Sequence, residues 1–177
     1  MGPAQRWLAE IPMDAELKAP ADLGARVERL VARSPFAFKD PRYCYTMGKW
    51  RPHVGDARFV CVFRDPLVTA QSMLTDASND RYLRDLEVDS ARALRVWVAM
   101  YRHVLGKHAG QGKWLFLHYD QLLDADGVAR LAEFLQAPIT GQSIDKGLRR
   151  SQRKGELPEE AAAIYRDLCR RAGVESP

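Results

Sequence analysis

The fold of this 177-residue chain is decided by residues 58–72, which read Arg58-Phe59-Val60-Cys61-Val62-Phe63-Arg64-Asp65-Pro66-Leu67-Val68-Thr69-Ala70-Gln71-Ser72. The first part of this stretch is rich in β-branched and aromatic residues, which predicts a strand buried on both faces, as in a parallel sheet. The second part begins a helix, because Asp65 can cap free backbone amides and Pro66 suits the first helical position. Arg64 stands at the junction, where strand ends and helix N-termini of α/β sheets bind anions.

The rest of the chain alternates between predicted helices and strands, which indicates an α/β fold with a parallel sheet flanked by helices. We expect a single domain over residues 1–177, because this length can bury one core. Residues 1–20 contain three prolines and predict an irregular arm that packs through Trp7, Leu8 and Ile11. Helices are expected at about 22–33, 66–76, 90–108, 125–136 and 158–172, strands at 36–38, 58–63 and 114–118, a helical turn within 46–54, a surface loop at 78–89 and a basic connection at 138–155.

The composition favours a protein that handles an anionic small molecule. Lys and Arg number 27 against 23 Asp and Glu, a net charge of +4, which is too small to indicate nucleic-acid binding. The three cysteines have neither a disulfide pattern nor zinc spacing, so a reducing cytoplasm and no metal are expected. No signal peptide or run of membrane-spanning length is found.

Three residues are candidates for binding an anion at the end of the central strand. The guanidinium of Arg64 offers a fork of donors that suits phosphate oxygens, and Ser72 lies about two turns into the following helix. Lys39 follows the first short strand and could steady a charged transferring group. The alternatives are that Arg64 pairs with a surface carboxylate, Ser72 is merely helical and Lys39 is a solvated loop residue.

Other polar residues carry weaker signals. The run Lys146, Arg149, Arg150, Arg153, Lys154 could cover a polyanion, although a solvated basic face is the usual explanation. His118 ends a strand and could be a general base, but a core role is preferred. Neither G-x-x-x-x-G-K-[ST] nor G-x-G-x-x-G occurs, so ATPases, kinases and dinucleotide dehydrogenases are poorly supported.

Taken together, these segments resemble the sulfotransferases that use 3′-phosphoadenosine 5′-phosphosulfate, especially the bacterial branch. In that family an "R-(D/N/H)-P" step leaves a central strand and a Ser follows the Arg by eight residues, as Arg64 and Ser72 do here. The similarity covers about residues 36–170. Its other segments are Phe38-Lys39-Asp40-Pro41-Arg42-Tyr43, the helix with Trp97 and Tyr101, Leu117-His118-Tyr119-Asp120-Gln121-Leu122-Leu123 with Leu131 to Leu135, and Arg153-Lys154-Gly155, for which Leu148-Arg149-Arg150-Ser151 is a rival alignment.

The resemblance implies a P-loop-like fold and a set of roles. Arg64 and Ser72 would hold the 3′-phosphate of the nucleotide, and Tyr119 would contact its adenine. Lys39 would steady the sulfonate, which passes in line to a hydroxyl or amine of an unknown acceptor. Arg150, Arg153 and Lys154 would add to the nucleotide site.

One family feature is not found. The family's "P-(K/R)-S-G-T-(T/S)" turn, which holds the 5′-phosphosulfate, should lie upstream of Lys39, and none of the 38 preceding residues form it. The resemblance therefore implies a fold shortened at its N-terminus, with an inner strand missing. Such a sheet leaves unpaired backbone beside an apolar slot. The arm could fill the slot, or another chain could, as in a homo-oligomer, or the sequence is a shortened reading of a longer protein. The alternative function is a non-catalytic relative that binds adenosine 3′,5′-bisphosphate or a protein partner.

Overall fold

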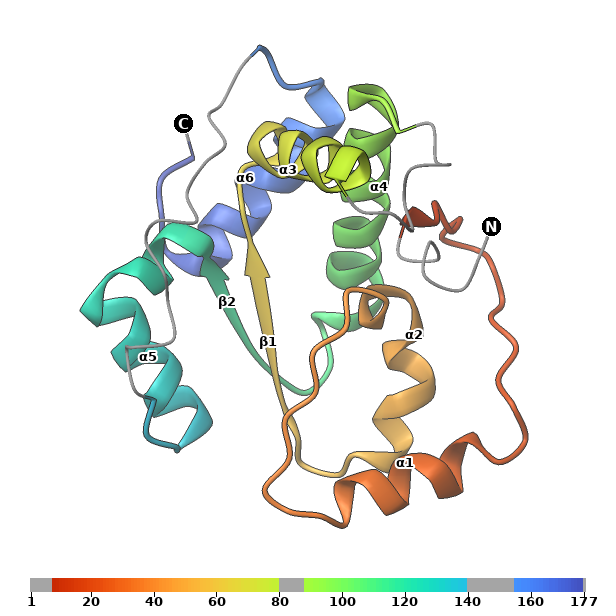
Figure 1. Cartoon of the computed structure of the whole chain (residues 1–177). Helices are drawn as coiled ribbons and strands as arrows, with labels where there is room; N and C mark the ends of the chain where they lie inside the picture. Colours follow the sequence, from red (N-terminus) through yellow and green to blue (C-terminus); the bar gives the residue numbers. More distant parts are fainter. Residues whose placement is uncertain (1–7, 80–87, 140–154, 177) are drawn as a thin grey trace.

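The computed structural model describes residues 8–79, 88–139 and 155–176. Its elements alternate as expected for an α/β protein (Figure 1). In chain order they are α1 (Leu23–Val31), α2 (Tyr43–Trp50), the 3₁₀ turn η2 (Arg51–His53), β1 (Arg58–Phe63), α3 (Pro66–Asn79), α4 (Ser90–His103), the π-helical segment η3 (Val104–His108), β2 (Lys113–His118), the 3₁₀ turn η4 (Tyr119–Leu123), α5 (Ala125–Leu135) and α6 (Glu159–Ala172).

The two described strands form a parallel sheet. β1 pairs with β2 in a register that places Phe59 opposite Trp114 and Phe63 opposite His118. The chain crosses between them through α3, α4 and η3. The α/β parallel architecture predicted from the alternating pattern is therefore confirmed, and the two strands lie where the sequence predicted them.

The main core covers one face of this sheet. Cys61 and Phe63 of β1 and Phe116 of β2 point to this side and belong to one buried cluster with residues of α4 and α6. Trp97 of α4 and Leu168 of α6 are each 0% exposed in this cluster. Apolar residues of these two helices therefore form much of the core on this side of the sheet.

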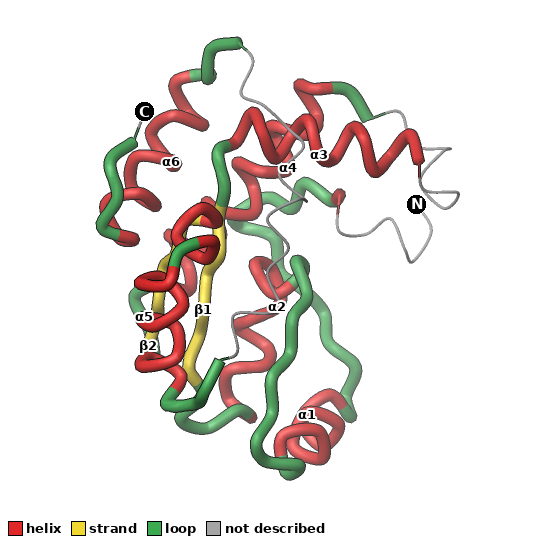
Figure 2. Tube along the Cα trace, turned by 60° about the vertical axis from the view of Figure 1, so that its left-hand side comes forward, coloured by secondary structure: helices red, strands yellow, loops and turns green. Residues whose placement is uncertain are grey.

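The opposite face is covered only in part. α5 lies against β2 (Figure 2), and Leu117 on that side is 0% exposed. Its register partner Val62 in β1 is 41% exposed. The prediction that residues 58–63 are buried on both faces is therefore wrong for β1, because α5 covers β2 and leaves Val62 open.

The described part of the N-terminal arm, residues 8–20, contains no α-helix or strand, and Trp7 of the predicted contacts lies outside the described residues. Leu8 is 1% exposed within the main core. The Tyr45 hydroxyl donates a hydrogen bond to the Ala9 carbonyl at 2.7 Å, and His103 Nε2 lies 2.8 Å from the Ile11 carbonyl. The described part of the arm therefore lies against α2 and α4.

Some predicted boundaries are wrong. Residues 36–38 form no strand, because no described segment forms a hydrogen-bonded ladder with Phe36 or Phe38. Their rings stack with centroids 5.6 Å apart, and Phe38 leans on Trp50. α2 begins at Tyr43, before the predicted turn.

Helix ends also differ from the prediction. α3 continues through Asn79 into the predicted surface loop, of which residues 80–87 lie outside the described residues, as does most of the basic connection. Within the described ranges, no helix has the length and apolar character needed to cross a membrane.

Candidate functional site

The junction between β1 and α3 has the local structure that its sequence predicts. Asp65 is 8% exposed, and its Oδ1 accepts hydrogen bonds from the backbone amides of Leu67 at 2.8 Å and Val68 at 3.1 Å. Pro66 takes the first helical position. The carboxylate thus occupies the amides that a bare helix N-terminus would offer to an anion. A ligand phosphate beside Arg64 must therefore be held chiefly by side chains.

Arg64 and Tyr119 lie together at the carboxyl ends of the two strands. The guanidinium carbon of Arg64 is 4.9 Å from the centre of the Tyr119 ring, within the range of a cation–π contact. The contact follows from the register, because Phe63 and His118 are partners and Arg64 and Tyr119 come directly after them. Both side chains are half-buried. The ring thus orients the guanidinium at the edge where parallel sheets bind ligands.

Ser72 lies on α3, half-buried, seven residues after the capping Asp65. Seven residues are close to two helical turns, so both positions share one side of the helix, about 10 Å apart along its axis. An anion that meets both Arg64 and Ser72 would therefore lie along the side of α3. Arg150, Arg153 and Lys154, the other predicted nucleotide-binding residues, lie outside the described residues.

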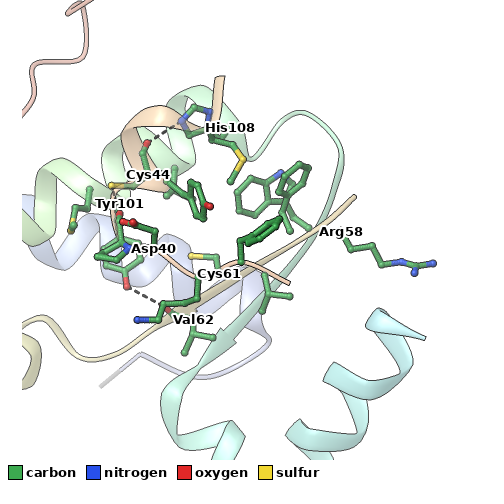
Figure 3. A pocket seen from close by; sticks show the side chains of 17 residues that line it. Asp40, Cys44, Arg58, Cys61, Val62, Tyr101 and His108 are labelled. Carbon is green, nitrogen blue, oxygen red and sulfur yellow. Dashed lines mark hydrogen bonds between the residues drawn. The ribbon is translucent and has the colours of Figure 1, made fainter. Parts of the chain in front are cut away.

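Lys39 is placed elsewhere, at a pocket of about 450 Å³ between the segment Phe38–Pro41 and β1 (Figure 3). The lysine is exposed. The pocket reaches Val62, two residues before Arg64, but neither Arg64 nor Tyr119 lines it. The structure thus unites two predicted site residues, Arg64 and Tyr119, and sets Lys39 at a neighbouring cavity.

The Asp40 carboxyl and the Cys44 and Cys61 thiols, which line this pocket, have shifted pKa values. Arg42 donates hydrogen bonds to Asp40 and lowers the pKa of its carboxyl. Burial raises the pKa of the Cys44 and Cys61 thiols to about 12, so both stay protonated at neutral pH. No cluster of potential metal ligands is found among the described residues.

His118 and Tyr165 form a buried polar pair that the sequence did not predict. His118 Nε2 lies 3.1 Å from the Tyr165 hydroxyl, and Nδ1 accepts a hydrogen bond from the Asp120 amide at 3.2 Å. Gln121 completes the cap by accepting from the His118 amide at 2.8 Å. Both ring nitrogens thus have partners, Nδ1 in the turn that carries Tyr119 and Nε2 on α6, which favours the core role of His118 over that of a general base.

Only a weak signal for this pair exists in the sequence. Tyr165 lies in the predicted last helix, and a buried tyrosine hydroxyl needs a hydrogen-bond partner. His118 is 47 positions away, so spacing alone could not join the two.

Comparison with known proteins identifies the family of the chain that carries this junction. The model of the sulfotransferase family matches residues 2–141, which is most of the chain. The chain belongs to the sulfotransferase family. No curated protein and no solved structure matches it.

Proposed function

We propose that the junction of β1 and α3 binds the 3′-phosphate of an adenine nucleotide, and that the protein transfers a sulfonate from 3′-phosphoadenosine 5′-phosphosulfate to a hydroxyl or amine. The observation that supports this most strongly is the stacking of Arg64 on Tyr119, 4.9 Å apart, beside α3. It presents a fixed guanidinium to a phosphate, for which bidentate hydrogen bonds are well suited. Family membership supports the choice of donor.

The remaining roles follow from the same proposal. Ser72 would donate to the same phosphate along the side of α3, and Arg150, Arg153 and Lys154 would add positive charge. Lys39 would stabilise the sulfonate as its bond to the phosphate oxygen breaks and a bond to the acceptor oxygen or nitrogen forms. The acceptor's proton would pass to a base that is not among the residues assigned here.

A second candidate is a relative that binds adenosine 3′,5′-bisphosphate without transfer. It is favoured by the position of Lys39, which is exposed at the neighbouring pocket, a cavity that neither Arg64 nor Tyr119 lines. The location we propose for either activity is the cytoplasm.

Calorimetric titration with adenosine 3′,5′-bisphosphate tests the shared nucleotide site. We expect Arg64→Ala to weaken binding about 10- to 100-fold, the usual cost of losing charge-assisted hydrogen bonds. The control is Arg95→Ala, which removes an exposed arginine of α4 that pairs with Glu10. This variant should bind the bisphosphate as the wild type does. Adenosine 5′-monophosphate lacks the 3′-phosphate, so Arg64→Ala should change its affinity little.

A transfer assay with the sulfonated donor and a panel of phenols, alcohols and amines separates the two candidates. Sulfonate transfer by the wild-type protein that is lost in Lys39→Ala supports the first candidate, the enzyme. Binding without transfer over the whole panel supports the non-catalytic relative. Failure of the wild-type protein to bind the bisphosphate would refute both.

A further inference from the structure

β1 has a free edge that opens into the pocket of about 450 Å³. Five consecutive residues of the strand, 58–62, line this pocket. Successive side chains of a strand point to opposite faces, so a run of neighbours lines a cavity only where the cavity meets the edge of the strand. β2 pairs with the other edge. The pocket therefore lies where a third strand would pair.

Backbone groups along this edge point into the pocket. The Tyr101 hydroxyl donates to the Val62 carbonyl at 3.1 Å, so the peptide groups of Val62 face away from β2 (Figure 3). Backbone groups alternate in direction along a strand, and those of Val60 therefore face the same way. Within the described ranges, no backbone hydrogen bond joins this edge to another segment. The edge thus presents donors and acceptors with a period of two, of which the Val62 carbonyl already accepts from Tyr101.

Apolar side chains surround these backbone groups. The opposite wall is the segment Phe38–Pro41, which runs beside β1 (Figure 1) without forming a strand. At the rim, Phe38 is 43% and Val62 41% exposed. Large apolar side chains that are exposed together around a cavity mark an interaction site.

An extended peptide fits this combination better than a small molecule. A compact apolar ligand fills volume but forms no hydrogen bonds with the backbone along this edge of β1, whereas an added strand forms them and places alternate side chains in the pocket. Residues 8–20 of this chain do not line the pocket. The segments 1–7, 80–87 and 140–154 contain no run of three apolar residues that could serve as such a strand.

Charge at the rim further defines the partner. Lys39 contributes an exposed cation, while the Asp40 carboxylate is engaged by Arg42 Nε at 2.8 Å. An acidic residue beside the apolar run of the partner would complement Lys39.

We propose that the free edge of β1 accepts an extended apolar strand from a separate polypeptide, which pairs with Val60 and Val62 and presents a carboxylate to Lys39. Binding of this strand does not depend on a nucleotide at Arg64. It covers the rim and converts the two-stranded sheet into one of three strands, in which β1 is central.

Amide hydrogen exchange on the full chain tests this proposal. The probe is an acetylated peptide of about six alternating Val, Ile and Thr residues followed by Glu. We expect it to slow exchange of the Val60 and Val62 amides by roughly tenfold or more, and to leave Cys61 unchanged because its amide faces β2. A matched peptide with alternate N-methylated amides keeps the side chains but cannot form the ladder, and it should not bind.

A pair of variants tests the charge. Lys39→Glu should lower the affinity for the Glu-containing peptide by about tenfold and leave the affinity for a Gln-containing version unchanged. The control is Lys49→Glu on the exposed surface of α2, which should change neither affinity. The proposal is overturned if no peptide binds, if the N-methylated peptide binds equally well, or if exchange slows without the period of two. Slow exchange of the Val60 and Val62 amides in the free protein would also overturn the proposal. It would mean that a segment of this chain pairs with the edge or, if the protection rises with protein concentration, that a second copy does.

Discussion

Two adjacent residues, Arg64 and Asp65, have opposite charges and separate tasks. The Asp65 carboxylate satisfies two backbone amides of α3, while Arg64 turns away to stack on Tyr119. If Asp65 were absent, the helix N-terminus itself would attract an anion. At the proposed nucleotide site, Asp65 would therefore keep the phosphate on the side of α3, where Ser72 lies.

Replacing Asp65 tests this division. Asp65→Ala removes the acceptor of the Leu67 and Val68 amides and should lower the free energy of unfolding by about 1–2 kcal/mol, whereas Asp65→Asn should cost less because Asn also caps. Urea denaturation of both variants measures the difference. Equal loss of stability in the two variants would contradict a capping role.

At this scale the sequence predicts local contacts well and distant ones poorly. The cap formed by Asp65 and Pro66 involves neighbours, so its pattern is visible in the residues themselves. Tyr119 was assigned to the same site only through the family resemblance, and its contact with Arg64 depends on the strand register. The pair of His118 and Tyr165 joins residues from β2 and α6, and no spacing rule connects them.

The element that carries Tyr119 depends on one close backbone approach. A Cβ atom on Gly127 of α5 would lie 1.9 Å from the Gln121 carbonyl oxygen of η4, whereas at Gly110 nothing lies within 4 Å. Gly127 is buried. The turn η4 can therefore pack against α5 only because residue 127 has no side chain.

Substitution at these two glycines should have opposite effects. Gly127→Ala forces η4 away from α5 and should destabilise the protein by about 1–3 kcal/mol or more, outweighing the gain in helix propensity. Gly110→Ala, the matched control, should be neutral or slightly stabilising. Thermal and urea denaturation give both values. A Gly127→Ala protein as stable as the wild type would mean that the turn is free to shift.

Periodicity predicts elements whose burial is decided within their own sequence. The helices α4 and α6 and the strand β1 are of this kind. Phe36 and Phe38 show the same alternation as a strand, and their rings stack on each other with Phe38 against Trp50, but they belong to no sheet. A strand requires a hydrogen-bonded partner as well as a pattern, and no described segment pairs with residues 36–38.

On the scale of the whole molecule, the same limit explains the open edge of β1. The composition of residues 58–63 predicts a central strand, but whether both edges and both faces are covered depends on what lies beside it. α5 covers β2 and leaves Val62 at 41% exposure. The exposure of Val62 within an apolar strand therefore depends on the tertiary structure and cannot be predicted from the sequence of the strand alone.

Stability of the whole molecule should depend on pH through two buried histidines. Burial lowers the pKa of both His103 and His108, whose Nε2 atoms lie 2.8 Å from the Ile11 carbonyl and 2.9 Å from the Cys44 carbonyl. The folded protein therefore resists protonation that the unfolded chain accepts near pH 6.5. Stability is then fully present above about pH 6.5 and falls as the pH drops below it, because the unfolded state binds more protons.

The free energy of unfolding, measured by urea denaturation between about pH 7.5 and 5, should show this decline before most carboxylates titrate. Gln can donate the same hydrogen bond but does not titrate in this range. His108→Gln should therefore flatten the profile, and the double variant with His103→Gln should flatten it further. A profile that keeps the wild-type slope in the double variant would mean that other groups set the acid sensitivity, and stability that rises on acidification would contradict the role of burial at both sites.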